Sequence, residues 1–461
     1  MVDATRRPWQ GPEDVPPRPS AGWTARAPRR AAPWVAGVLL AALWHTAAEP
    51  ARGDEGLQGD GVLSLRSDVW NGSRQLSARR TPVATAGVWA RGKADVPGVG
   101  QVVGNGWVRE QTGHENRDEP RTRVRELYLR RDFGPIELKL GRQIVAWGRA
   151  DGLNPTDNLS PRDFRLLVPQ DADLRHGNEA IKLETAAPLG RVSWLWFPHG
   201  ASHTLPLEAV AGVTYRAERP RGSQWALRWD LASSGGIDGS LSYFQGADPM
   251  PDLVPGAASP TSLEVVLRNQ RLQVLGADLS WVHGGVVWRT EIALTRTDSR
   301  GAADFAHKKP QAWWVGGGEW TLGEGGATTL GLQGTWLHVR GHGDPDTLVP
   351  AGPLRDLAWR QLATSGQTSV NQAGVLWRLA RRLRNDTVTL ETTGVALWPV
   401  GGDDADAGGG SGLLRASADI GLDDHWQLQF GGEQFFGPRR RSLFGQLRPN
   451  SLVYVQLRRG M

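Results

Sequence analysis

The sequence contains no cysteine and only 3 methionines in 461 residues. The missing cysteine excludes disulfide bonds, zinc–thiolate sites and thiol catalysis together. Beyond the N-terminal region, no segment approaches the run of about 18 apolar residues that a membrane-spanning helix needs. A fold of this chain must therefore use neither covalent cross-links nor helical spans.

Motifs for catalysis and metal binding are absent as well. The 10 histidines are dispersed, without the His-Glu-x-x-His spacing of zinc hydrolases, and no Gly-x-Ser-x-Gly or phosphate-binding glycine motif occurs. Asp171 and Asp173 lie close enough in sequence to approach a calcium ion, but the EF-hand pattern is missing. We therefore expect no enzyme activity, no cofactor and no metal site.

The net charge of the chain is +5. A basic balance is compatible with nucleic-acid binding, but the arginines are scattered and no recognition motif accompanies them, so we expect no nucleic-acid partner. Two other classes of partner stay open. Arginines lining an internal passage would attract anionic solutes, whereas arginines on the surface would bind the phosphates of lipopolysaccharide.

The N-terminal region has the residue order of a secretory signal. Arg26, Arg29 and Arg30 lie directly before an apolar segment over residues 31–43, and small residues follow up to Ala48. We expect residues 1–48 to be a signal peptide with an extended basic start, followed by a linker over 49–60. A membrane anchor is the alternative, although the apolar segment is short for a span.

The rest of the chain repeats the period-two alternation of half-buried β-strands. In "WQLQFGGEQFF", the apolar residues Trp426, Leu428 and Phe430 alternate with Gln427 and Gln429. Glycine-rich and proline-containing turns separate many such runs, and no amphipathic helix of comparable length intervenes. We expect an all-β chain of antiparallel strands.

Lipid outside and water inside would explain these two-faced strands. Tryptophan, of which the chain has 22, suits the membrane–water interface, and a closed sheet leaves no unpaired edge in hydrocarbon. No fixed sequence repeat indicates a propeller. We predict a transmembrane up-and-down β-barrel of roughly 16–18 strands over residues 61–461. A soluble periplasmic protein that binds polysaccharide through its tryptophans is the alternative.

Two segments resemble a known family. Residues 126–164, "ELYLRRDFGPIELKLGRQIVAWGRADGLNPTDNLSPRDF", resemble porin-like Gram-negative outer-membrane barrels catalogued as a domain of unknown function, and more distantly alginate-export and phosphate-selective porins. The matching positions are Gly141, Arg142, Gln143, Trp147, Gly148, Pro161 and Asp163. The resemblance implies an outer-membrane channel.

The C-terminal residues 431–461 are similar to the closing hairpin of such barrels. These barrels usually end on an aromatic residue read by the barrel-assembly machinery, whereas this chain ends on Gly460 and Met461. The alternation through Val453 and Val455 still predicts a final strand. We expect the assembly machinery to be a partner that acts here without the usual terminal aromatic residue.

Residues 144–177 form one long connection that is rich in proline and charge. Prolines stiffen it, which argues against disorder, and a loop this long is commonly functional. Together with the strand end before it, this segment supplies ten candidate pore residues: Arg142, Arg149, Asp151, Asp157, Arg162, Asp163, Arg165, Asp171, Asp173 and Arg175. One interpretation is a constriction in the lumen whose arginines meet an anionic solute. The other is a loop on the rim whose ion pairs only fix its shape.

These observations predict a porin-like channel in the outer membrane of a Gram-negative cell, in contact with membrane lipid and lipopolysaccharide. The alternative is an export or assembly conduit, which passes polymer, lipid or hydrophobic compounds with the help of a periplasmic partner. Unaided solute uptake would separate the first function from the second.

Overall fold

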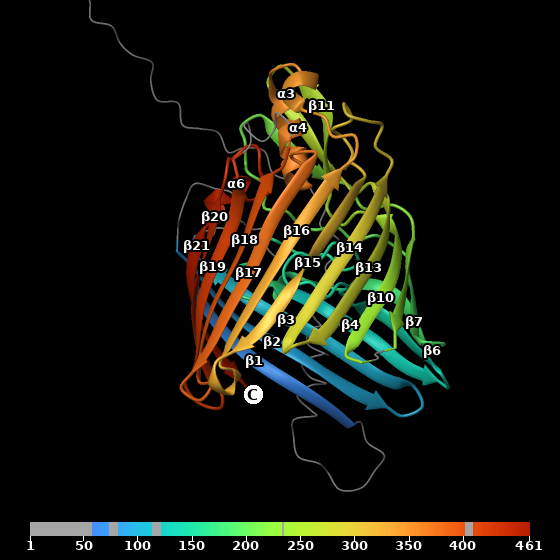
Figure 1. Ribbon diagram of the computed structural model, residues 1–461, viewed down its shortest axis with the longest axis vertical. Helices are drawn as coiled ribbons and strands as arrows, with labels where there is room; N and C mark the ends of the chain where they lie inside the picture. Colours follow the sequence, from blue (N-terminus) through green and yellow to red (C-terminus); the bar gives the residue numbers. More distant parts are fainter. Residues whose placement is uncertain (1–57, 73–81, 113–120, 233–234, 402–408) are drawn as a thin grey trace, which may run out of the picture.

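The computed structural model describes residues 58–72, 82–112, 121–232, 235–401 and 409–461. These residues form one 18-stranded sheet that closes on itself, because β1 pairs with both β2 and β21. Each strand is antiparallel to its neighbours, so the architecture is an antiparallel β-barrel (Figure 1). The strand number lies within the predicted range, and the predicted fold class is confirmed.

The barrel strands are β1 (Gln58–Asn71), β2 (Pro82–Val96), β3 (Gly100–Thr112), β4 (Thr122–Phe133), β5 (Ile136–Gln143), β6 (Asn178–Ala187), β7 (Gly190–Phe197), β9 (Gln224–Leu231), β10 (Ile237–Ala247), β13 (Arg271–His283), β14 (Val286–Thr297), β15 (Gln311–Leu322), β16 (Thr328–Val339), β17 (Asn371–Leu383), β18 (Val388–Pro399), β19 (Ser411–Gly421), β20 (Trp426–Phe436) and β21 (Leu452–Gly460). The first strand begins slightly before the boundary expected at residue 61. The predicted signal peptide, 1–48, lies outside the described residues.

The two ends of the barrel differ in the length of their connections. At one end, short turns join the strands, such as Gly284–Gly285 between β13 and β14, where both glycines have the positive φ that tight hairpins require. Long connections lie at the other end. We call these the short-turn end and the long-loop end; the C-terminus lies at the short-turn end (Figure 1).

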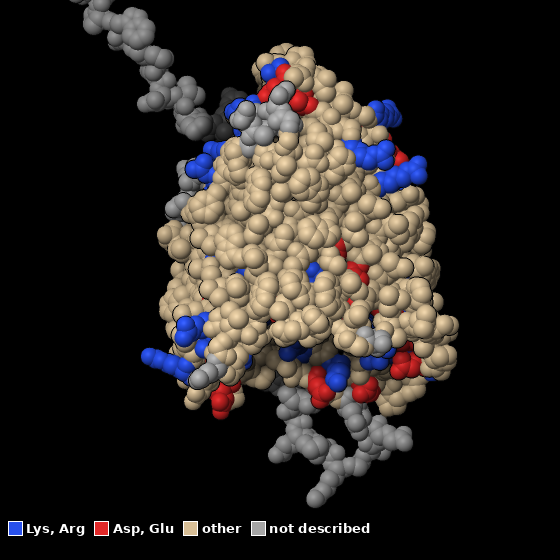
Figure 2. All heavy atoms as spheres, in the orientation of Figure 1, with Lys and Arg blue, Asp and Glu red and all other residues tan. Residues whose placement is uncertain are grey.

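The outer surface of the barrel is apolar. On β14, Ile292 and Leu294 are 42% and 49% exposed. Glu291, on the opposite face of the same strand, is 1% exposed and points inward. Figure 2 shows the consequence, since charged side chains gather at both ends and leave a broad belt between them. The predicted alternation of faces is therefore present in the structure.

Aromatic side chains border the apolar belt. At the short-turn end, the rings of Trp281 and Trp288 stack with centroids 6.0 Å apart, and Trp320 meets Trp288 edge to face at 5.8 Å. Toward the long-loop end, Trp336 and Trp398 are 41% and 40% exposed. Such paired girdles are typical of barrels that cross a membrane.

A small cap stands at the long-loop end. Its three-stranded sheet consists of β8 (Val213–Ala217), β11 (Asp252–Ser259) and β12 (Ser262–Arg268). Helix α4 (Pro353–Thr364) packs on β11, beside the short helix α3 (Pro345–Leu348) (Figure 1). Short helical turns also occur at α2 (Asp171–Leu174), η1 (Glu324–Gly326), α6 (Leu443–Gln446) and η2 (Arg448–Asn450). Within the described ranges, no helix has the length and apolar character to cross a membrane.

A buried carboxyl group joins α4 to the cap sheet. Asp252 is 2% exposed and accepts a hydrogen bond from Gln361 Nε2, while Gln361 Oε1 accepts one from Leu253 N at 2.6 Å. Burial, reinforced by the neighbouring Asp248 carboxylate, raises the pKa of Asp252 to about 7. Between the ordinary pKa near 3.8 and about pH 7, Asp252 in the docked cap therefore keeps a proton that an exposed aspartate would release.

This proton makes docking of α4 dependent on pH. A raised acid pKa contributes stability that is present below the ordinary value near 3.8 and is lost as pH rises through about 7. We expect hydrogen-exchange protection of α4, corrected for intrinsic rates, to fall about tenfold or more between pH 4.5 and 7.5. Asp252→Asn should remove this dependence; a variant with the wild-type slope would contradict the assignment.

Candidate functional site: a loop across the barrel lumen

Residues 144–177, here called the inner loop, leave the wall after β5 and return to it at β6. Gln143 and Asn178 are Cα partners, so the loop departs and returns at one point of the sheet. From there it contacts strands on both sides of the lumen. Its apolar side chains show this most directly.

One set of apolar side chains packs against the wall from β6 to β14. Val145, Trp147 and Leu159 are 8%, 8% and 2% exposed and belong to one buried cluster with inward-facing wall residues. The wall members are Ala180, Leu195, Phe197, Ala226, Phe244, Leu272, Val274 and Ala293. The inner face of this wall is therefore apolar where the loop rests on it, although the alternation predicted a polar lumen.

A second set packs on the opposite part of the sheet. Leu166, Val168 and Leu174 cluster with Trp89 of β2 and Trp107 of β3. In the strand order, β2 and β3 lie half a turn of the barrel away from β13 and β14. The inner loop therefore spans the lumen and does not lie on the rim.

Apolar packing holds the inner loop more strongly than its exposed ion pairs do. Full burial of one large apolar side chain contributes roughly 1.5–3 kcal/mol, and Val145, Trp147 and Leu159 are all buried. An exposed ion pair contributes roughly 0–1 kcal/mol, which applies to Asp171 with a side chain that is 60% exposed. We therefore attribute the position of the loop to its apolar contacts and to its buried polar contacts with the wall, and little of it to this exposed pair.

Glu291 of β14 is the polar centre of this attachment. Its carboxylate accepts hydrogen bonds from the backbone N–H groups of Arg149 (3.1 Å), Ala150 (3.4 Å) and Thr156 (2.7 Å), and from Thr156 Oγ1 (2.7 Å). Gly148 has φ +97, and a Cβ there would lie 2.6 Å from Glu291 Oε2. This glycine of the family-like motif is therefore needed for the close approach of the loop to Glu291.

Arg149 and Asp151 attach the same part of the loop to neighbouring strands. Arg149 Nε donates to Asp278 Oδ1 of β13 at 2.5 Å. Asp151 accepts from Arg289 Nη1 of β14 at 3.0 Å, and its backbone N–H donates to Gln333 Oε1 of β16 at 3.1 Å. The charge on each loop residue is opposite to that of the wall residue it meets.

Asp157 is the centre of an ion-pair cluster inside the loop. Its carboxylate accepts from Arg162 Nη2 at 2.8 Å and from Arg175 Nη2 at 2.6 Å, and it is 3% exposed as a side chain. The backbone N–H of Arg162 donates to His203 Nδ1 at 2.9 Å. Burial, with the nearby charge of Arg162, lowers the pKa of His203 to about 3, so this ring is neutral and can accept that bond.

Asp163 joins the loop to β4. It accepts from Arg123 Nη2 at 2.9 Å and from Arg165 Nε at 3.1 Å, and it is fully buried. Burial alone would raise its pKa, but the hydrogen bonds and charges of Arg165 and Arg123 hold the pKa of Asp163 below its usual range. The carboxylate therefore stays ionised in the folded loop.

The last charged part of the loop faces the arginines of β1, β4 and β19. Asp173 accepts from Arg66 Nη1 at 2.5 Å and lies 3.4 Å from Arg125 Nη1. Asp171 accepts from Arg415 Nη1 at 2.5 Å. Loop aspartates thus meet basic side chains on this side of the barrel, while Arg149 meets an acidic side chain on the other.

Most of the predicted charged residues contact other protein groups rather than the open lumen. The side chains of Arg149, Arg162, Arg165 and Arg175 are at most 28% exposed, and each lies beside a carboxylate. Asp151 and Asp171 are the more accessible ones, with side chains 44% and 60% exposed. Of these loop residues, the two aspartates are therefore the ones most open to solvent.

The structure corrects the expectation for Arg142. This residue lies on the same face of β5 as Leu140, which is 49% exposed, and on the face opposite to Gln143, which is 3% exposed. Its guanidinium binds Glu179 Oε1 at 3.1 Å on the outer surface. Strand parity places Arg142 outside the lumen, in spite of its position in the family-like motif.

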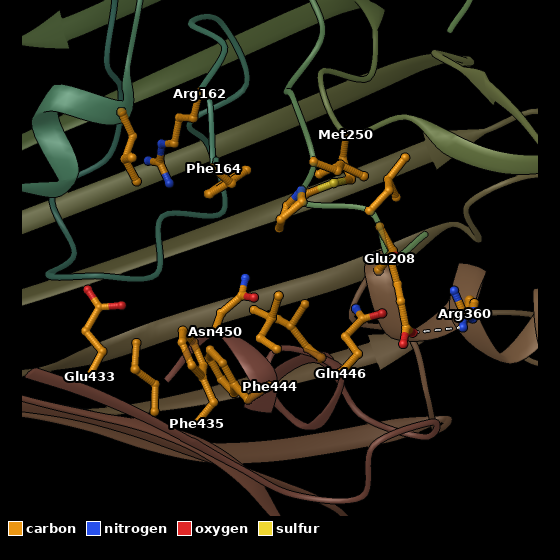
Figure 3. Close-up of a pocket in the computed structure, with 18 of the residues that line it drawn as sticks. Arg162, Phe164, Glu208, Met250, Arg360, Glu433, Phe435, Phe444, Gln446 and Asn450 are labelled. Atoms are coloured by element: carbon orange, nitrogen blue, oxygen red, sulfur yellow. Dashed lines mark hydrogen bonds and ion pairs between the residues drawn. The ribbon is translucent and has the colours of Figure 1, made fainter. Parts of the chain in front are cut away.

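A cavity of about 1310 Å³ lies between the inner loop, the cap and strands β16 to β20. Figure 3 shows Arg162 and Phe164 on one side, Phe435 of β20 and Phe444 of α6 opposite them, and Glu208 paired with Arg360 of α4. The charged residues that line it are Asp151, Asp171, Glu208, Asp356, Glu391, Asp419, Glu433, Arg162, Arg360, Arg378 and Arg415. Seven carboxylates against four guanidiniums leave the cavity wall acidic.

Sequence reasoning did not single out the wall residues of this site. Glu291, Asp278, Arg66 and Arg415 occupy inward positions of ordinary alternating strands, and many other polar residues share that pattern. The sequence indicates which face of its strand each residue occupies, but it does not indicate which strands lie against the loop. In the part of the chain that the structure describes, no group of three or more metal-ligating side chains occurs.

Comparison with solved structures supports the barrel. OpdO of Pseudomonas aeruginosa aligns with a TM-score of 0.54 and 11% identity, over 87% of this chain and 96% of that one. OccK11 (OpdR) of the same organism gives 0.52 and 12% over 87% and 96%. OccAB1 of Acinetobacter baumannii gives 0.52 and 10% over 90% and 99%. At identities this low, the structural similarity establishes a shared fold alone.

No family model matches the chain, and no curated protein matches it. The resemblance to the porin-like family catalogued as a domain of unknown function therefore stays a prediction.

Proposed function

We propose that the protein is an outer-membrane channel through which small solutes pass beside the inner loop. The observation that carries this proposal is the cavity of about 1310 Å³ that remains between the loop and strands β16 to β20. An 18-stranded barrel encloses more space than its own side chains fill. The loop narrows that space on one side and leaves a passage on the other.

The membrane location rests on the outer surface. An apolar belt between two aromatic girdles, short turns at one end and long connections at the other are the features of outer-membrane barrels. In this placement the long-loop end and its cap face the exterior, and the short-turn end faces the periplasm. The fold shared with OpdO, OccK11 and OccAB1 supports the same assignment.

The wall of the cavity favours solutes that carry a positive group. Its carboxylates outnumber its guanidiniums, and Asp419 accepts hydrogen bonds from Gln427 and Gln429 without an ion pair to any described residue. Fixed carboxylates in a narrow passage attract cations. We therefore propose cationic or zwitterionic small molecules as the solute class, in place of the anions that the basic composition suggested.

Ion selectivity tests this proposal. Barrels reconstituted in a planar bilayer under a KCl gradient should conduct and should show a reversal potential of the sign for cation preference. Asp419→Asn should shift that potential toward anions, because it removes from the passage a carboxylate that has no direct ion pair with a described residue. Asp423→Asn is the matched control, since Asp423 is exposed in the β19–β20 turn and binds backbone N–H groups there. Anion preference in the wild type would contradict the solute class, and absent conductance would contradict the channel.

The alternative conduit for polymers receives less support. The inner loop is attached on both sides of the lumen, so a polymer could pass only after several buried contacts had broken. Solute uptake by liposomes that contain this protein alone would distinguish the two functions, because a conduit needs its periplasmic partner.

A further inference from the structure

Three arginines form a row on the outer surface at the long-loop end. Arg271 begins β13, Arg296 lies near the end of β14, and Arg340 follows β16 directly; all three are exposed. We call these residues the rim arginines. They share the strand face of the lipid-exposed Leu275, Leu294 and Trp336.

The strand register brings the rim arginines close together. Arg296 pairs with Gln273, so Arg271 is its diagonal neighbour on the same face, at a Cα separation of roughly 7–8 Å. Arg340 donates its backbone N–H to Pro310 O, which places it in the same row two strands from Arg296. Two strand spacings amount to about 10 Å.

In the part of the chain that the structure describes, these charges lack an acidic partner. Among the described residues, no carboxylate forms an ion pair with a rim arginine, although Asp298 follows β14 nearby. Arg271 donates only to Ser223 O, at 3.3 and 3.4 Å, beside a segment that adds Arg219 and Arg221. Like charges held this close favour an external anion.

Arg142 provides a contrast on the same kind of surface. It also lies on the outer face at the long-loop end, but it binds Glu179 at 3.1 Å and is neutralised there. An arginine on the outer surface of this barrel can thus have a carboxylate partner, and among the described residues the rim arginines have none.

Apolar surface continues directly below the rim arginines. Leu275, Leu294, Trp314 and Trp336 are 54%, 49%, 42% and 41% exposed on the same strand faces. Figure 2 shows basic side chains at the upper right, above the uncharged belt. A ligand seated here would place its anionic group at the arginines and an apolar part against these side chains.

We propose that the rim arginines bind the phosphate groups of a lipid in the outer leaflet, of the lipid A kind. Guanidinium groups hold phosphate oxygens with charge-assisted, paired hydrogen bonds, and the acyl chains would lie on the leucine and tryptophan surface. The proposal rests on the membrane placement in the proposed function but not on solute passage.

Lipid binding in neutral detergent tests the proposal. The thermal midpoint of the full-length barrel should rise saturably with purified lipid A, and it should not rise with phosphatidylcholine or with inorganic phosphate. In Arg271→Gln/Arg296→Gln/Arg340→Gln, the apparent affinity for lipid A should fall roughly a hundredfold, because each arginine contributes a factor of about five near a charged lipid surface. The triple variant loses no ion pair within the described part of the chain and should keep its lipid-free midpoint.

Arg381→Gln/Arg384→Gln is the matched control, with exposed arginines changed at the short-turn end. It should bind lipid A like the wild type. Wild-type affinity in the triple variant, an equal loss in the control, or an equal shift with inorganic phosphate would each overturn the proposal. Conductance separates this outcome from the channel function, since the triple variant should conduct normally even when lipid binding is lost.

Discussion

Removal of residues 150–174 should raise the single-channel conductance of the barrel by roughly threefold or more, since an 18-stranded barrel without its inner loop has a wide aqueous lumen. The shortened connection can still close, because Gln143 and Asn178 are adjacent Cα partners. Conductance in planar bilayers measures the change. Cation preference should weaken together with it, because Asp151 and Asp171 are lost from the edge of the passage.

The deletion also uncovers apolar wall residues, so its folding must be checked separately. Leu195, Phe197 and Phe244, which the loop covers, would face water in the shortened barrel. Circular dichroism should still report the strands, since the ladder hydrogen bonds lie in the wall. Unchanged conductance in a folded variant would mean that the loop does not limit passage.

The barrel itself could be predicted from sequence because alternation is a local signal. Trp426, Leu428 and Phe430 face outward and Gln427 and Gln429 inward as a direct consequence of strand geometry. Alternation also gives the two faces of β7, but it does not show that Leu195 and Phe197, which point into the lumen, are fully buried there. Their environment is set by the inner loop, whose contacts join residues far apart in the chain.

The candidate site was predictable only in part for the same reason. Sequence composition marked the inner loop as unusual, and its aspartates and arginines were named, but their partners could not be. Asp163 binds Arg123, and Asp171 binds Arg415, at sequence separations that no local pattern encodes. Arg142 shows a second limit of sequence reasoning. A resemblance to a family motif does not indicate which face of its strand a residue occupies, and Arg142 lies on the outer face.

Glu291→Ala should release the part of the inner loop near Arg149 without removing any residue from the passage. The substitution leaves the N–H groups of Arg149, Ala150 and Thr156 without the carboxylate that now accepts from them. Each buried donor that loses its partner costs about 1–3 kcal/mol. We expect hydrogen-exchange protection at residues 149–156 to fall by more than tenfold, with frequent conductance fluctuations where the wild type conducts steadily.

Glu319→Ala distinguishes this effect from a simple loss of lumen charge. Glu319 lies inward on the next strand, β15, and its ion pair is with Arg289 of the wall at 3.6 Å, not with the loop. It should alter ion selectivity but leave the protection of residues 149–156 at the wild-type level. Equal loss of protection in both variants would mean that lumen charge, and not the hydrogen bonds of Glu291, holds the loop. Steady conductance in Glu291→Ala with protection lost would instead show that this part of the loop lies away from the path of the ions.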